Sequence, residues 1–104
     1  MITVMNRTRE RAIANLQRMV LDALGPRQAE VWLFGSCARE ETRQHSDIDI
    51  AIWPQDDLPA TFFSSLAAEI EDSAIPYDVD LADLRHADPA LIDEVRREGV
   101  RWRD

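Results

Sequence analysis

The sequence reads EVWLFGS at residues 30–36 and, after ten further residues, DIDIAIW at residues 47–53. The first stretch is apolar and aromatic and stops at a glycine, as a buried strand does when it enters a turn. The second stretch alternates acidic and apolar residues and then becomes continuously apolar, which is typical of a strand that starts near solvent. We therefore predict two strands, with a glycine-serine turn after the first and two acidic residues at the start of the second.

The glycine-serine turn has the chemistry of a phosphate site. Gly35 lets the backbone turn sharply and approach a ligand, and Ser36 can offer its hydroxyl and cap a short helix through Arg39. Unpaired amides at a helix start favour an anion, such as a triphosphate. Such a pair alone is more often a turn with a helix cap. For Arg39, a phosphate contact and a salt bridge with a neighbouring acid are both open.

The acidic stretch predicts a metal site. Residues two apart in a strand point to the same face, so Asp47 and Asp49 project together while Ile48, Ile50 and Ile52 point into the core. Two close carboxylates repel each other unless a cation intervenes, and oxygen ligands without histidine or thiolate suit Mg²⁺. An isolated Asp-x-Asp is usually a solvated face, so the metal hypothesis depends on further residues.

A third carboxylate is available in YDVDLA at residues 77–82. Two-metal phosphoryl chemistry commonly uses several acidic ligands. The alternation puts Asp78 and Asp80 on one face of a predicted strand and Val79 and Leu81 on the other. Periodicity alone does not separate Asp78 from Asp80 as the third ligand.

Three motifs together resemble a known family: LFGSCAR at residues 33–39, SDIDI at residues 46–50 and VDL at residues 79–81. They are similar to the minimal nucleotidyltransferases of the DNA polymerase β superfamily, the MntA-like antitoxins of HEPN/MNT toxin–antitoxin systems. The spacing from Gly-Ser to Asp-x-Asp is much more specific than an isolated Asp-x-Asp. The resemblance implies an α+β (α/β) nucleotidyltransferase fold, a small mixed β-sheet flanked by helices, with ATP and two Mg²⁺ ions at one edge.

The resemblance also implies a role for each matching residue. Gly35 and Ser36 would hold the triphosphate. Asp47 and Asp49 would bind both metal ions, and Asp80 would bind the catalytic ion and help to activate the acceptor hydroxyl.

One departure from the family pattern stands next to the turn. The position after Ala38 and Arg39 is often glycine in the family, and here it is Glu40. This change can alter the turn or the access of the acceptor, but it leaves the predicted metal ligands intact.

The implied reaction is an in-line attack by an acceptor hydroxyl on the α-phosphate of ATP, which releases pyrophosphate and leaves AMP on the acceptor. Family members paired with HEPN toxins act as antitoxins that transfer AMP to a toxin tyrosine, so a HEPN-domain partner is expected. Two alternatives stay open. One is an antitoxin that neutralises its partner by binding alone, and the other is a small-molecule nucleotidyltransferase, which would need extra chain for an acceptor pocket.

Composition narrows the classes of partner. The chain has 104 residues, which we interpret as a single domain over residues 1–104, too small to add a substrate-recognition domain and compatible with an oligomer or hetero-oligomer. A net charge of −8 argues against extended nucleic-acid binding. All 12 basic residues are arginines, which excludes Walker A and Schiff-base chemistry. No apolar run could span a membrane, no signal peptide is visible, and a single cysteine suits a reducing cytoplasm.

Periodicity predicts the remaining elements. Apolar residues at helical spacing from Met5 to Leu24 stop at a Gly-Pro pair, and a second helix should run from an N-cap at Asp57 to about Ser73. The Asp-Pro pair at residues 88–89 predicts a last helix that ends at Gly99, followed by a short edge strand at residues 100–103. The arginines at residues 96–97, 101 and 103 could contact a partner or nucleotide, although a solvated C-terminal face is the more common arrangement.

Overall fold

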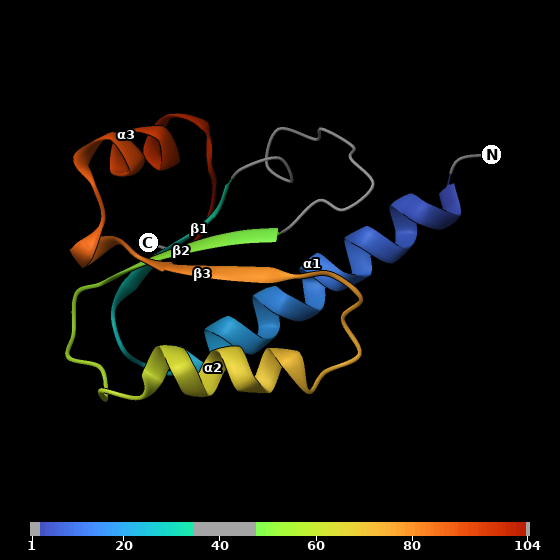
Figure 1. Ribbon diagram of the computed structural model, residues 1–104, viewed down its shortest axis with the longest axis horizontal. Helices are drawn as coiled ribbons and strands as arrows, with labels where there is room; N and C mark the ends of the chain where they lie inside the picture. Colours follow the sequence, from blue (N-terminus) through green and yellow to red (C-terminus); the bar gives the residue numbers. More distant parts are fainter. Residues whose placement is uncertain (1–2, 35–47, 104) are drawn as a thin grey trace.

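The computed structural model describes residues 3–34 and 48–103 (Figure 1). Four residues of the predicted site, Gly35, Ser36, Arg39 and Asp47, lie outside the described residues, as does Glu40. The elements in chain order are α1 (Thr3–Leu24), β1 (Ala29–Phe34), β2 (Ile48–Pro54), α2 (Phe62–Glu71), β3 (Val79–Asp83), the 3₁₀ helix η1 (Leu84–His86), α3 (Pro89–Glu98) and β4 (Val100–Arg103).

The four strands form one mixed sheet in the order β3-β2-β1-β4. β1 is antiparallel to both β2 and β4, whereas β2 and β3 are parallel. Parallel neighbours need a crossover, and α2 supplies it between β2 and β3. In Figure 1, α1 and α2 lie on one side of the sheet and α3 lies on the other. The predicted mixed sheet flanked by helices is therefore confirmed.

The larger core lies between the sheet and the pair α1 and α2. Ile48, Ile50 and Ile52 are fully buried in it, as their alternation along β2 predicts. Helix α1 contributes a buried stripe at Leu16, Val20 and Leu24, spaced by four residues, and α2 contributes the stripe Phe62, Leu66 and Ile70. The apolar side of β2 is thus fixed toward α1 and α2, and its other side faces α3.

A smaller apolar cluster joins α3 to the opposite face. Trp32 and Ala51 of the sheet are buried against Leu84 of η1 and Val95 of α3. Phe34 and Trp53 pack around this cluster. Because Asp49 shares its parity with Ala51 and Trp53, Asp49 lies on the α3 side of the sheet.

Two predicted boundaries were wrong. Helix α2 begins after Thr61 instead of Asp57, because the chain first makes a turn in which the Phe62 amide donates to the Pro59 carbonyl at 3.0 Å. Burial of the α2 stripe on the core sets the start of the helix and outweighs the local capping signal. The sequence also predicts that the third strand starts at Pro76, but β3 begins at Val79, where its pairing with Ile48 begins.

The C-terminal predictions hold. Helix α3 begins at Pro89 after Asp88 and is followed by Gly99, and β4 forms an edge of the sheet. In the described part of the chain, no helix combines the length and the apolar character that a membrane span requires.

Candidate active site

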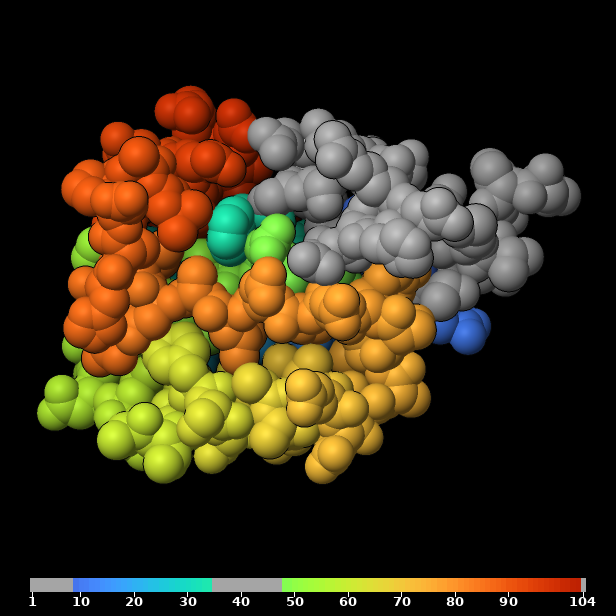
Figure 2. Space-filling view, in the orientation of Figure 1, coloured from blue at the N-terminus to red at the C-terminus, as the bar shows by residue number. Residues whose placement is uncertain are grey.

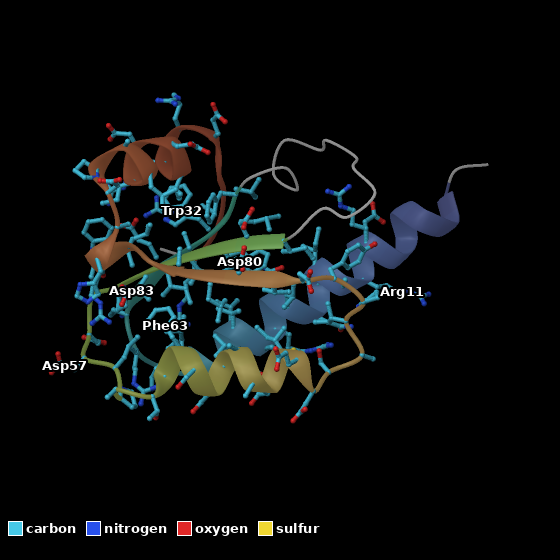
Figure 3. The ribbon with its side chains drawn as sticks, viewed as in Figure 1. Arg11, Trp32, Asp57, Phe63, Asp80 and Asp83 are labelled. Carbon is cyan, nitrogen blue, oxygen red and sulfur yellow. The ribbon has the colours of Figure 1, made fainter. Side chains whose placement is uncertain are left out.

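The starts of β2 and β3 bring two of the predicted carboxylates together. In the parallel register between these strands, Asp49 is the direct partner of Asp80. Directly opposed residues of neighbouring strands project to the same face, so both carboxylates lie on the α3 side of the sheet. Asp49 is half-buried and Asp80 is exposed. Figure 3 labels Asp80 on β3, and Figure 2 shows β3 as a surface band between α2 and α3. Because β3 is an edge strand, the Asp80 carboxylate of this acidic pair is accessible to solvent.

Apolar residues on the other face fix this register. Ile48 pairs with Val79 and Ile50 pairs with Leu81, and all four side chains pack in the core beneath α1 and α2. A slip of one residue would turn the carboxylates into that core. Because polar and apolar residues alternate along both strands, packing of the apolar residues in the core also sets Asp49 opposite Asp80.

Asp78 precedes Asp80 by two residues and lies just before the start of β3. Its side chain is exposed and has the same parity as that of Asp80. Its carbonyl accepts a hydrogen bond from the Ile48 amide at 2.9 Å. The register therefore sets Asp80, and not Asp78, directly across from Asp49.

The end of β1 lies next to the acidic pair. Phe34 pairs with Asp49 in the antiparallel register and is the residue bonded to Gly35. The chain thus leaves the sheet for the predicted phosphate turn from the position directly beside the acidic pair. Sequence reasoning did not single out Phe34, because only the strand register shows that it lies next to a carboxylate.

The donor set suits a hard divalent cation. Both members of the acidic pair offer carboxylate oxygens, the ligands that Mg²⁺ prefers. Within residues 3–34 and 48–103, no three histidine, cysteine or acidic side chains gather as a metal site. The third predicted ligand, Asp47, lies outside these residues.

A family model described as polymerase beta, nucleotidyltransferase matches residues 26–101, which is most of the chain. The chain belongs to this nucleotidyltransferase family. Over 74 residues it is 38% identical to the protein adenylyltransferase MntA of Shewanella oneidensis. That alignment covers 71% of this chain and only 52% of the relative, so the chain spans about half the length of this curated relative.

Solved structures with the same fold include two toxin–antitoxin complexes. One, a toxin–antitoxin with AMP-PNP, has a TM-score of 0.66 and 32% identity, with 83% of this chain and 71% of that chain covered. Another is a tri-AMPylated Shewanella oneidensis HEPN toxin in complex with an MNT antitoxin. It has a TM-score of 0.60 and 30% identity, with 86% of this chain and 70% of that chain covered. The resemblance to minimal nucleotidyltransferases is therefore confirmed.

In this family member, two C-terminal arginines pack on the α3 side of the sheet. Arg101 lies 5.0 Å from the ring centre of Trp32, and Arg96 lies 5.1 Å from that of Trp53. Both guanidinium groups also lie near Glu30, with nitrogen to oxygen distances of 3.7 Å for Arg96 and 3.5 Å for Arg101. Stacking and ion pairing together hold α3 and β4 against the sheet. Their positive charges are thus engaged within the protein and are not simply a solvated face.

Strand β3 ends in a charged cap. The Asp83 carboxylate accepts a hydrogen bond from the Arg85 amide at 3.0 Å and two from its guanidinium, at 3.0 and 2.8 Å. The side-chain hydrogen bond from Arg85 is the main reason that the pKa of Asp83 is lowered from its ordinary value. This cap fixes the far end of the strand whose start bears Asp80.

Proposed function

We propose that this chain is a Mg²⁺-dependent nucleotidyltransferase that transfers AMP from ATP to a hydroxyl of a protein acceptor, a tyrosine of a HEPN-family toxin, and acts as the antitoxin. The observation that supports this most directly is the register that opposes Asp49 to Asp80 beside the end of β1. Membership of the nucleotidyltransferase family supplies the reaction class. The named relatives, an adenylyltransferase and an antitoxin bound to an AMPylated toxin, supply the acceptor class.

Hydrogen-bond donors and carboxylates have different roles in this proposal. Backbone amides and the Ser36 hydroxyl would bind and orient the triphosphate, because a glycine turn exposes donors to an anion. Carboxylates would hold the cations. The proposed triphosphate ligands are Gly35, Ser36 and Arg39, and the proposed metal ligands are Asp47, Asp49 and Asp80.

The proposed reaction exchanges one phosphorus–oxygen bond for another. The acceptor oxygen attacks the α-phosphorus in line, the bond from that phosphorus to the bridging oxygen breaks, and pyrophosphate leaves. The Asp80 carboxylate lies at the exposed end of the acidic pair, where it can receive the hydroxyl proton as a general base. Bound Mg²⁺ would neutralise charge on the departing pyrophosphate and lower the pKa of the acceptor hydroxyl.

The partner and compartment follow the same proposal. An acidic chain of net charge −8 suits a basic partner whose own ligand is RNA, and it does not suit extended nucleic-acid binding by itself. We place this activity in a single domain over residues 1–104 that assembles with its toxin in the cytoplasm.

The test is direct labelling. The purified chain is incubated with α-labelled ATP, Mg²⁺ and the proposed HEPN-domain partner, taken from the adjacent gene, and both proteins are then analysed by mass spectrometry. We expect an AMP adduct on a tyrosine of the partner, and no adduct when EDTA replaces Mg²⁺. The absence of any adduct under conditions where the two proteins bind each other would overturn the enzymatic proposal.

A further inference from the structure

A groove of about 400 Å³ lies between α1 and the segment that connects α2 to β3. Its apolar lining comes from both sides. Ala12 and Met19 belong to α1, whereas Ile75 and Pro76 belong to the connecting segment. Ala12 is buried, and Met19 and Ile75 are half-buried. The groove therefore offers a partly apolar floor to a ligand.

One wall of the groove is cationic. Arg11, Asn15 and Arg18 follow one another at helical spacing along α1, and the two arginines are exposed. Arg18 donates a hydrogen bond to the Asn15 side-chain oxygen. Within the described residues, neither Arg11 nor Arg18 forms an ion pair with a carboxylate. None of the residues that line the groove is acidic. In a chain of net charge −8, this wall is a local exception.

The groove lies beside α1, on the side of the sheet opposite to the acidic pair, and its connecting segment leads into the edge strand β3. Pro76, which lines the groove, precedes Asp80 by four residues. Four residues of extended chain span at most about 14 Å. Figure 3 shows Arg11 beside the segment that leads into β3. A protein segment that is seated in the groove and passes around the edge strand β3 can thus bring a hydroxyl to the acidic pair.

We propose that this groove binds an acidic segment of the acceptor protein, one that combines carboxylates with an apolar side chain. Carboxylates would pair with the planar guanidinium groups of Arg11 and Arg18, and the apolar side chain would cover Met19 and Ile75. This inference rests on the proposed function, because it assigns the surface that presents the acceptor to the acidic pair. Charge complementarity at a local site of this kind fixes the orientation of a partner.

The experiment reverses the charge of the wall. The double variant Arg11→Glu with Arg18→Glu is compared with Arg97→Glu, which changes an exposed arginine on α3, across the sheet. The partner is the HEPN-domain protein used for labelling. We expect the double variant to raise the Kd of the complex and the KM for the acceptor by at least about tenfold, equivalent to about 1.4 kcal/mol, while the KM for ATP stays unchanged. Arg97→Glu should change neither quantity by more than about twofold.

A second variant changes shape without changing charge. Ala74 is exposed and lines the groove, so Ala74→Trp should fill the groove without straining the core. We expect it to weaken the complex to a similar extent, with an unchanged circular dichroism spectrum. Wild-type affinity in both the double variant and Ala74→Trp would overturn the proposal. So would equal losses in the double variant and Arg97→Glu, because they would indicate a general charge effect.

Binding and transfer separate this inference from the proposed function. If the wild-type chain binds the partner but transfers no AMP, the proposed function fails, and the Kd values still test the groove. If transfer occurs and the groove variants bind normally, the proposed function holds and the groove inference fails. Cross-linking from a photoreactive residue at Asn15 identifies the segment that docks, and attachment to a basic segment would also overturn the proposal.

Discussion

At the scale of single residues, the proposed chemistry depends on the residue opposite Asp49. Asp80 occupies that position in the strand register, and Asp78 lies two residues earlier, before the start of β3. We expect Asp80→Asn to lower AMP transfer by at least about 100-fold, because it removes a proposed base and metal ligand while it preserves size. The measurement is the initial rate of transfer, with the melting temperature as a check on folding.

Asp78→Asn is the matched control for that substitution. It removes one negative charge just before the start of β3, and the hydrogen bond from the Ile48 amide is unaffected because the Asp78 carbonyl remains. We expect this variant to keep transfer within about fivefold of wild type, since it changes the local potential without removing a ligand. Transfer near wild type in Asp80→Asn, with loss in Asp78→Asn, would reassign the third ligand to Asp78.

The alternation of polar and apolar residues predicted which side chains share a face of a strand, but not which residues are paired between neighbouring strands. The isoleucines of β2 and the pair Val79 and Leu81 pack in the core as predicted. The opposition of Asp49 and Asp80 needed the register, which depends on contacts between strands far apart in the sequence. Likewise, the arginines at residues 96 and 101 gave no sign of their shared partner Glu30, because that contact forms only when α3 and β4 pack beside β1.

At the scale of elements, the cap at the end of β3 makes stability depend on pH. The lowered pKa of Asp83 means that its carboxylate stabilises the fold above its unfolded pKa of about 3.9 and that this contribution is lost as the pH falls through the lower folded pKa. We expect Asp83→Ala to reduce the free energy of unfolding by about 1 kcal/mol at pH 7, with a difference that shrinks below about pH 4.

Denaturant titrations at pH 7, 5 and 3 measure the free energy of unfolding of wild type and Asp83→Ala, and the difference between them tests this effect. Asp88→Ala is the control, because Asp88 precedes α3 as its N-cap but its side chain makes no capping hydrogen bond. A difference between wild type and Asp83→Ala that stays constant over the whole pH range would contradict the assigned role of the carboxylate.

The turn between α3 and β4 depends on close approach. A Cβ added at Gly99 would lie 2.5 Å from the Val95 carbonyl oxygen and 3.2 Å from that of Leu33. We expect Gly99→Ala to lower the free energy of unfolding by about 1–3 kcal/mol, because backbone atoms must move. Gly25 is the contrasting case, since its φ of 61° disfavours alanine, whereas an added Cβ would lie 4.0 Å from the Asp22 carbonyl oxygen, an ordinary contact. Gly25→Ala should therefore cost about 1–2 kcal/mol through backbone conformation alone.

Chemical denaturation of both glycine variants tests this distinction, and Gly25→Asn refines it. Asparagine tolerates a positive φ better than alanine does, so Gly25→Asn should recover part of the loss. Gly99→Asn should recover nothing, because its Cβ meets the same carbonyl. A full recovery at Gly99 would show that conformation, and not close approach, limits that turn.

Element boundaries show where local sequence is a sufficient guide. The Asp-Pro pair before α3 predicted its start correctly, with Asp88 at the N-cap and Pro89 as the first residue of the helix. The same kind of pattern at Asp57 failed for α2, since the buried stripe of Phe62, Leu66 and Ile70 determines where that helix begins. Tertiary packing overrides a capping pattern when the two disagree.

At the scale of the whole molecule, the mixed sheet was predictable from motif resemblance, whereas the surfaces around it were not. The order β3-β2-β1-β4 follows from one parallel crossover and two antiparallel pairings. The groove beside α1 combines Arg11 and Arg18 with residues more than fifty positions away in the sequence. Helical spacing could have shown the polar stripe on α1, but only the tertiary fold shows the apolar floor beside it.

The proposed antitoxin role requires either catalysis or binding alone, and one double variant separates these two functions. Asp47→Asn with Asp49→Asn removes two proposed metal ligands and changes no residue that lines the groove or belongs to the larger core. Because the metal-bound charges are needed only for transfer, we expect loss of AMP labelling by at least about 100-fold with the complex still formed. We also expect the toxin to stay active in cells that express both proteins, as measured by growth. Growth equal to that with the wild-type chain, together with lost labelling, would show that binding alone neutralises the toxin.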